Sequence, residues 1–107
     1  MQEQAINIIK EELEKKDINL MKIILFGSRA RGDFNHESDW DFFVVVGKEL
    51  SFQERRSILG EIHRKLAKLE DSYEIILKSI SGFEKVKNFV GSVSYEVNKE
   101  GVMLWKS

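Results

Sequence analysis

The sequence predicts a small α+β domain of α/β character, in which helices flank one small mixed β-sheet. Segments with helical spacing of apolar residues alternate along the chain with short runs of aromatic and β-branched residues. The connection between the first two of these runs, residues 27–38, has little helical character, so these strands need not be parallel. The 107 residues, of which 42% are hydrophobic, suit a single domain over residues 1–107.

The first half of the chain contains one expected helix and two expected strands. Residues 3–16 are expected to form the helix, because their apolar side chains recur three to four positions apart. Residues 22–26, KIILF, form a brief apolar run that ends at a glycine, which is typical of a buried strand. Residues 39–46, DWDFFVVV, are rich in aromatic and β-branched residues and are expected to form the second strand.

The second half begins with a capping-box pattern, in which Ser51 is followed by a glutamate three residues later. The helix behind it is expected to continue to about Leu69. Residues 73–79, YEIILKS, alternate as a third strand. The capping-box spacing recurs at Ser81, so we expect one further helix that ends at Gly101, followed by VMLW as a short strand or packed tail. This last helix should bury its apolar residues: Phe83, Val86, Val90, Val93 and Val97.

Composition and charge argue against several functional classes. The net charge of −1 leaves no basic footprint for nucleic acid, so direct nucleic-acid binding is not expected. The chain has no cysteine and therefore neither disulfides nor thiolate metal sites. No apolar run is long enough to cross a membrane, and the acidic, amphipathic beginning MQEQAINIIKEELEKK does not resemble a signal peptide. We therefore expect a soluble, cytoplasmic protein.

The stretch GSRARGDFNHESDWD concentrates glycines, arginines and aspartates. Gly27 permits a sharp turn after the first strand, and the free backbone N–H groups of such a turn bind anions, commonly phosphate. The Ser28 hydroxyl can donate a further hydrogen bond, and Arg29 and Arg31 can neutralise phosphate charge. Two alternatives stay open: Arg29 is equally compatible with a surface position, and Arg31 with a pairing to Asp33 or to a backbone carbonyl.

Acidic residues follow at a spacing that suits a metal ion. Side chains alternate along a strand, so Asp39 and Asp41 lie on one face, with Cα atoms roughly 6–7 Å apart at ~3.3 Å per residue. The intervening Trp40 then points into the core. Two such carboxylates repel each other unless a cation lies between them, and their hard oxygen atoms favour Mg²⁺. Glu74 offers a third carboxylate, which can face Asp41 if the third strand lies beside the second, and Asp71 is its competitor.

These residues carry a resemblance to a known family. The pattern Gly27–Ser28, ten intervening residues and then Asp39-Trp40-Asp41 is similar to the motif of the minimal nucleotidyltransferases (MNT) of the DNA polymerase β superfamily. The segment 30–33 matches the family's A-R-G-D/E form, and the segment 100–102 resembles its E-G-V ending. Chains of this size in the family resemble the antitoxin half of HEPN/MNT toxin–antitoxin pairs.

The resemblance implies a DNA polymerase β-like nucleotidyltransferase fold and a reaction. Asp39 and Asp41 would hold one or two Mg²⁺ ions, and Glu74 would complete the metal site or help to deprotonate the acceptor hydroxyl. The hydroxyl would attack the α-phosphate of ATP, pyrophosphate would leave, and AMP would be transferred to a tyrosine of a partner HEPN ribonuclease toxin. The residues assigned to ATP are those of the turn and its arginines: Gly27, Ser28, Arg29 and Arg31.

An alternative is a catalytically weak antitoxin that neutralises its toxin by stoichiometric binding. The joint presence of Ser28, Asp39 and Asp41 favours an enzyme, whereas Glu74 stands where many relatives carry aspartate. Transfer to a small molecule or to RNA is disfavoured by the slight acidity and by the lack of room for a substrate domain. The acceptor, the nucleotide preference and a homodimer stay open. Three aromatic residues suit either the core or a dimer or partner surface: Phe89, Tyr95 and Trp105.

Overall fold

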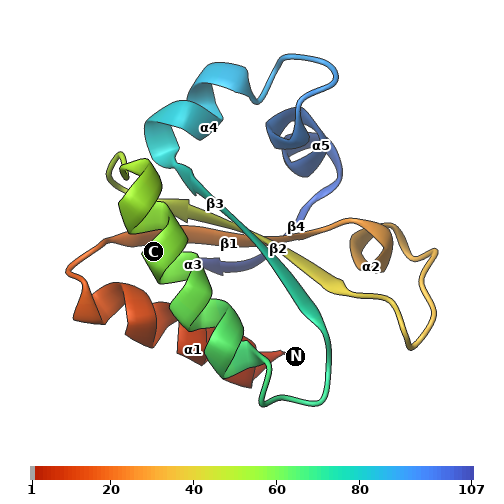
Figure 1. Cartoon of the computed structure of the whole chain (residues 1–107). Helices are drawn as coiled ribbons and strands as arrows, with labels where there is room; N and C mark the ends of the chain where they lie inside the picture. The colour runs from red at the N-terminus through yellow and green to blue at the C-terminus, as the bar shows by residue number, and fades with distance from the viewer. Residues whose placement is uncertain (1) are drawn as a thin grey trace.

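The computed structural model describes residues 2–107 as alternating helices and strands (Figure 1). The elements in chain order are α1 (Glu3–Lys15), β1 (Leu20–Phe26), α2 (Ser28–Arg31), β2 (Trp40–Val46), α3 (Phe52–Leu66), β3 (Tyr73–Ser79), α4 (Ile80–Val86), α5 (Val93–Glu100) and β4 (Val102–Lys106). The strands form one four-stranded sheet in the order β3-β2-β1-β4. β1 runs antiparallel to both β2 and β4, whereas β2 and β3 are parallel. The expected mixed sheet is therefore confirmed.

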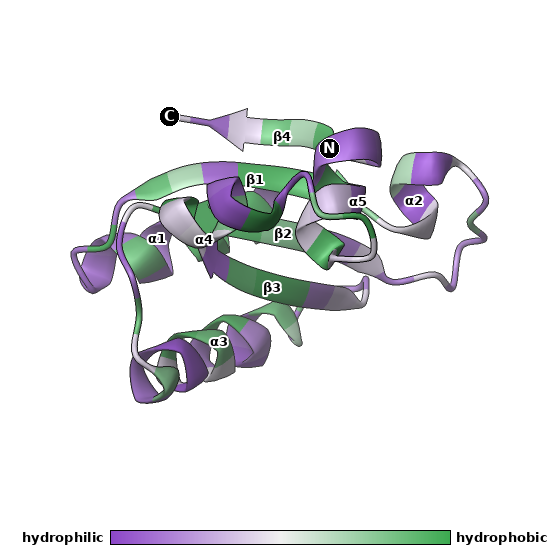
Figure 2. Ribbon diagram, turned by 90° about the horizontal axis from the view of Figure 1, so that it is seen from above, coloured by the Kyte–Doolittle hydropathy of each residue, from purple (hydrophilic) through white to green (hydrophobic). Residues whose placement is uncertain are grey.

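Two layers of helices cover the two faces of the sheet. α1 and α3 bury apolar side chains against one face, and α4 and α5 do so against the other. Figure 1 shows the sheet between these layers, and Figure 2 shows the hydrophobic colour along much of the strands. Side chains of β2 alternate between the two cores, with Trp40 and Phe42 in the first and Phe43 in the second. Trp40 thus points into the core as expected, and Asp41 lies on the α4–α5 face.

Most of the expected elements are present, with small shifts at their ends. β1 begins at Leu20, slightly earlier than expected, and α3 ends at Leu66, about one turn earlier. The capping box is confirmed, because the Ser51 hydroxyl accepts a hydrogen bond from the Glu54 N–H at 3.1 Å. The Glu54 carboxylate in turn accepts from the Ser51 N–H at 2.9 Å. Local sequence signals therefore located this helix start correctly.

The expectation of one continuous helix from Ser81 to Gly101 is wrong. Two short helices, α4 and α5, lie there and are joined by residues 87–92. Gly91 in this connection has a φ of 96°, which interrupts helical geometry. The Ser92 hydroxyl then accepts a backbone hydrogen bond at 3.0 Å and caps the start of α5. The apolar spacing by itself could not reveal this interruption.

The start of α4 also differs from the expectation. Its cap is Ser79, whose hydroxyl accepts a hydrogen bond from the Gly82 N–H at 3.0 Å. Ser81, the predicted cap, instead donates to Glu49 Oε1 at 2.7 Å. The Glu49 carboxylate, which lies in the segment between β2 and α3, therefore links this segment to the end of β3 and the start of α4.

The break between α4 and α5 changes which residues are buried. Phe83 and Val97 lie in the core, as expected, and Val86 is half-buried. Val90 and Val93, however, are 82% and 47% exposed, so their predicted burial is wrong.

The surface carries one strongly exposed aromatic side chain of the three that the sequence left open. Phe89 is 63% exposed, whereas Tyr95 and Trp105 are half-buried. No helix within residues 2–107 combines the length and the apolar content that a bilayer crossing needs.

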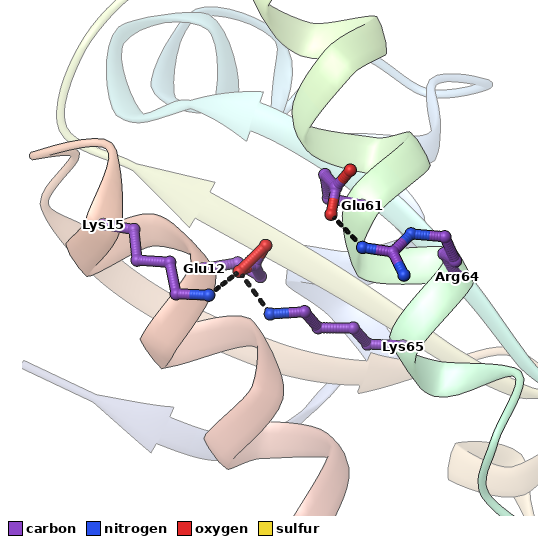
Figure 3. A network of polar contacts seen from close by, with 5 residues as sticks. All are labelled: Glu12, Lys15, Glu61, Arg64 and Lys65. Carbon is purple, nitrogen blue, oxygen red and sulfur yellow. Dashed lines mark hydrogen bonds and ion pairs between the residues drawn. The ribbon is translucent and has the colours of Figure 1, made fainter.

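A buried carboxylate joins α1 to α3. The Glu12 side chain is 4% exposed and accepts hydrogen bonds from Lys65 Nζ at 2.8 Å and Lys15 Nζ at 3.1 Å (Figure 3). The hydrogen bond from Lys65 is the main cause that lowers the pKa of the Glu12 carboxyl, against the opposing effect of burial. Nearby on α3, Glu61 and Arg64 form a pair at 2.6 Å that is open to solvent.

We expect Glu12→Gln to lower the free energy of unfolding by about 1–2 kcal/mol at neutral pH, because two ammonium groups lose their carboxylate partner. The folded-state pKa of Glu12 is lowered. The contribution of the ionised Glu12 to the free energy of unfolding is therefore complete above the ordinary glutamate pKa and disappears as the pH falls through the folded-state value. Urea unfolding curves of the two proteins should differ at neutral pH and converge in acid. Glu61→Gln is the matched control, because an exposed pair is worth at most about 1 kcal/mol. Equal losses from both variants would contradict this account.

Candidate active site

The end of β1 brings a tight turn against an acidic side chain of β2. Phe26 pairs with Asp41 in the antiparallel ladder, so the turn at Gly27 lies directly beside the Asp41 carboxylate. A methyl group built on Gly27 would overlap Asp41 Oδ2, and the φ of Gly27 is 76°. The turn and the close approach therefore both require glycine.

The short helix α2 follows this turn and begins at Ser28, which is half-buried. The Gly27 carbonyl accepts hydrogen bonds from the N–H groups of Ala30 and Arg31, each at 3.1 Å. As at the start of any helix, the first N–H groups lack a carbonyl partner within the helix itself. These N–H groups and the Ser28 hydroxyl have the chemistry to hold an anion close to Asp41.

Three carboxylates lie at this edge of the sheet. Asp41 pairs with Glu74 in the parallel ladder, so these side chains are neighbours on one face, as expected for adjacent strands. Asp39 lies one residue before β2 and is exposed. Burial raises the pKa of the Asp41 carboxyl, and the negative charges of Asp39 and Glu74 raise it further. The site therefore carries negative charge that a cation would offset.

Asp71, the competing third carboxylate, lies elsewhere. It is exposed in the segment before β3 and lines two hollows of about 540 and 410 Å³ next to Tyr73. Burial raises the pKa of the Tyr73 phenol, and the charge of Asp71 adds to this effect. The strand register thus brings Glu74, and not Asp71, beside Asp41.

A metal ion at this site would need ligands from outside the chain. Within residues 2–107, no three histidine, aspartate or glutamate side chains approach closely enough to enclose a metal ion on their own. Mg²⁺ fits such a site, since it is commonly bound through one or two carboxylates while water and phosphate oxygens complete its shell. Asp39 and Asp41 supply hard oxygen atoms, and the pKa of the Asp41 carboxyl is raised by burial and, in addition, by the charges of Asp39 and Glu74. The donor set therefore fits a divalent cation bound together with a phosphate ligand.

The Arg29 guanidinium is engaged by the loop that precedes β2. It donates to the Ser38 carbonyl from Nε at 3.2 Å and from Nη2 at 3.0 Å, and Nη2 also donates to the His36 carbonyl at 3.4 Å. The guanidinium carbon lies 4.2 Å from the centroid of the Trp40 ring and 4.7 Å from that of Phe34. The contact of Arg29 with phosphate stays a prediction, and these contacts favour a different role.

Arg31 interacts with two acidic side chains, Asp33 and Asp41. Its Nε lies 3.3 Å from Asp33 Oδ2, which realises the ion pair that the sequence left open. Its positive charge also lowers the pKa of Asp41, in opposition to the other acids. Because exposed ion pairs are weak, the guanidinium can leave Asp33 to meet an anion beside Asp41.

A cleft of about 280 Å³ adjoins Gly27 between α2 and α5. Sequence reasoning did not place Glu96 in this region, because its position depends on how α5 packs against β1. The E-G-V ending was the one available signal: a methyl group on Gly101 would overlap Ile24 of β1, and this close packing brings Glu100 to the cleft. The lining combines apolar, acidic and basic groups: Phe26, Gly27, Arg31, Val93, Glu96 and Glu100.

Comparison of the sequence with known proteins points to nucleotidyl transfer. Residues 7–106 match the family described as Polymerase beta, Nucleotidyltransferase. The chain is 35% identical, over 97 residues, to a Methanocaldococcus jannaschii protein to which protein adenylyltransferase activity is attributed. This match covers 84% of the present chain and 92% of the relative.

Solved structures share the fold. A Sulfolobus solfataricus protein to which nucleotidyltransferase activity is attributed is 25% identical and superposes with a TM-score of 0.65, covering 99% of this chain and 80% of that one. A chain in the complex of a tri-AMPylated Shewanella oneidensis HEPN toxin with an MNT antitoxin is 21% identical, with a TM-score of 0.58 and coverage of 100% and 74%. A chain in a toxin–antitoxin structure with AMP-PNP has the same identity and TM-score, with coverage of 94% and 73%. At 21% identity these two likenesses concern the fold alone.

Proposed function

We propose that this chain, which belongs to the polymerase beta nucleotidyltransferase family, transfers AMP from ATP to a hydroxyl group of a partner protein. The observation that carries the proposal is the strand register, which sets the Gly27 turn and Glu74 on either side of Asp41. The protein acceptor is supported by the activity attributed to the 35% identical relative. The partner we propose is a HEPN-type ribonuclease toxin, which is supported by the tri-AMPylated HEPN toxin in a complex that shares the fold. The acceptor that we propose on it is a tyrosine. We place the reaction in the cytoplasm, where ATP is available.

The turn would bind the triphosphate. The Ser28 hydroxyl and the first backbone N–H groups of α2 would donate hydrogen bonds to the β- and γ-phosphate oxygens. Arg31 would add a positive charge close to Asp41, since its charge already acts on that carboxyl. The glycine at position 27 lets the phosphates approach the backbone closely.

Asp39 and Asp41 would hold Mg²⁺, with Glu74 beside them. When bound, Mg²⁺ supplies neutralisation of the negative charge on the triphosphate. Ionised Asp41 is disfavoured by burial and by its acidic neighbours in the free protein, so its carboxylate is suited to share a cation.

Glu74 would receive the proton of the acceptor hydroxyl or take part in metal binding. In the transfer step the hydroxyl oxygen forms a bond to the α-phosphorus, while the bond from that phosphorus to the oxygen bridging to the β-phosphate breaks. The products are the AMP ester of the acceptor and pyrophosphate, and the proton lost by the hydroxyl passes to a carboxylate or to solvent.

The position of the radioactive label in ATP tests this function. The protein would be incubated with Mg²⁺ and the purified product of the neighbouring gene, using ATP labelled in the α-phosphate or, separately, in the γ-phosphate. AMP transfer predicts that the α-label enters the partner, with pyrophosphate released in equal amount, and that the γ-label does not. Entry of the γ-label would indicate phosphoryl transfer instead. A partner that is bound and inhibited without any label would favour the stoichiometric antitoxin.

A further inference from the structure

We infer that Arg29 is a positioning residue that fixes Asp39 relative to the Ser28 turn. The inference rests on the proposed function, because Asp39 matters here as a carboxylate that would hold the metal ion. It assigns Arg29 a task other than phosphate binding, and the reasons lie in the strand register and in the contacts of its guanidinium.

The strand ladders end short of Asp39, and a backbone hydrogen bond from the Trp40 N–H to the Ser72 carbonyl at 2.9 Å lies directly after it. The ladder between β1 and β2 ends at the pair of Phe26 with Asp41, and the ladder between β2 and β3 starts at Trp40 with Tyr73. Among the strand pairings of residues 2–107, Asp39 therefore has no partner, and its side chain is exposed. A carboxylate that must meet a cation loses affinity if it has to be ordered first, so a further contact that orders the chain on the other side of Asp39 favours cation binding.

Arg29 contacts the chain immediately before and immediately after Asp39. Its Nε and Nη2 both donate to the carbonyl of Ser38, at 3.2 and 3.0 Å. Its guanidinium carbon lies 4.2 Å from the centroid of the Trp40 ring, close enough for a cation–π contact. Trp40 is itself buried in the core beneath α1 and α3, so the ring that the Arg29 guanidinium contacts is held in place by packing.

The other end of this connection is the phosphate turn itself. Arg29 follows Ser28 directly in α2, so one side chain links the turn to the Ser38 carbonyl before Asp39 and to the Trp40 ring after it. The same guanidinium also meets His36 and the Phe34 ring, which orders the loop leading to Asp39. The Nε and Nη2 groups of Arg29 are thus engaged by the loop, whereas Arg31 forms an exposed ion pair with Asp33.

A lysine at this position cannot replace the arginine. The guanidinium is planar and offers several N–H donors in a fixed arrangement, so it can bond a carbonyl and stack on a ring at once. An ammonium group keeps the charge but loses this combination. Arg29→Lys therefore separates positioning from charge, and Arg56→Lys on the exposed surface of α3 is the matched control.

The test measures binding without an acceptor and without turnover. Mn²⁺ replaces Mg²⁺, so that the free metal concentration can be followed by electron paramagnetic resonance. The nucleotide is an ATP analogue with a methylene group between the α- and β-phosphorus, which prevents turnover. We expect Arg29→Lys to weaken Mn²⁺ binding in the presence of this analogue by about 10- to 100-fold, the usual effect of losing a residue that orients a metal ligand. Binding of the analogue in EDTA should stay within about twofold of wild type, and Arg56→Lys should behave as wild type in both assays.

Unchanged Mn²⁺ affinity in folded Arg29→Lys would overturn the inference. A loss of about tenfold in analogue binding in EDTA, with Mn²⁺ affinity unchanged, would also overturn it and make Arg29 a phosphate ligand. If circular dichroism shows that Arg29→Lys does not fold, Trp40→Phe decides: Mn²⁺ binding about threefold weaker supports the inference, and equal binding contradicts it. Wild-type protein that binds no Mn²⁺ with the analogue would instead refute the proposed function.

Discussion

Replacement of Asp41 by asparagine should lower the rate of AMP transfer by about 10²- to 10³-fold and, at the same time, raise the melting temperature of the nucleotide-free protein. The loss follows because Asp41 is the carboxylate that lies between the Gly27 turn and Glu74. The gain follows because burial and two neighbouring acids oppose the ionised form of Asp41. Asparagine keeps the size of the side chain and removes the charge.

The pH dependence of this stability gain has a definite sign. The folded-state pKa of Asp41 is raised, so the folded protein favours the protonated side chain. The resulting contribution to the free energy of unfolding is complete below the ordinary aspartate pKa and is lost as the pH rises through the folded-state value. The melting temperature of Asp41→Asn should therefore exceed that of wild type at about pH 7, and the difference should shrink at about pH 3, where both side chains are neutral. Scanning fluorimetry at the two pH values measures this. A variant less stable than wild type at neutral pH would contradict the electrostatic account.

Alanine at Gly27 should damage both stability and transfer, whereas alanine at Gly32 should damage stability only. Both glycines have a positive φ, 76° and 89°. Gly32 is in the αL conformation, where a side chain costs about 1–2 kcal/mol, whereas Gly27, with a ψ of −160°, has a conformation that is essentially confined to glycine. A methyl group on Gly27 would also overlap the Asp41 carboxylate, but on Gly32 it would meet nothing within 4 Å. Of the two substitutions, Gly27→Ala is therefore the one that displaces the Asp41 carboxylate.

We expect Gly27→Ala to lose about 1–3 kcal/mol more stability than Gly32→Ala, because the added methyl group overpacks the turn. Displacement of the Asp41 carboxylate should lower the AMP transfer rate by about 100-fold, while Gly32→Ala keeps a rate close to that of wild type. Denaturant unfolding and the α-label assay give the two numbers for each variant. Equal transfer rates in the two variants would mean that the turn and Asp41 do not act together.

The alternation of side chains along a strand allowed much of this site to be predicted. It placed Asp39 and Asp41 on one face and Trp40 in the core, and it set Glu74 against Asp41 once the two strands were assumed adjacent. The structure confirms Trp40 in the core and Glu74 beside Asp41. Asp39 lies just outside β2 and has no position in the ladders, so its shared face with Asp41 stays a prediction. The resemblance to the nucleotidyltransferase family is also confirmed, over residues 7–106.

Other features depended on contacts between distant parts of the chain. The apolar residues from Phe83 to Val97 have helical spacing, but Gly91 turns the backbone and leaves Val90 exposed. The direction of the Arg29 side chain is set by the Trp40 ring and the Ser38 carbonyl, neither of which has a spacing signal relative to the arginine. Charge alone therefore suggested phosphate binding.

A crystal structure of the protein with Mg²⁺ and the methylene analogue of ATP tests the central claim most directly. The claim is that one metal–nucleotide complex is held jointly by the Gly27–Ser28 turn and by the paired acids of β2. The account predicts a metal ion bound by both Asp39 and Asp41, with the β- and γ-phosphates at the backbone of Gly27 and Ser28. A nucleotide bound elsewhere on the domain, or a metal ion that touches neither aspartate, would contradict it.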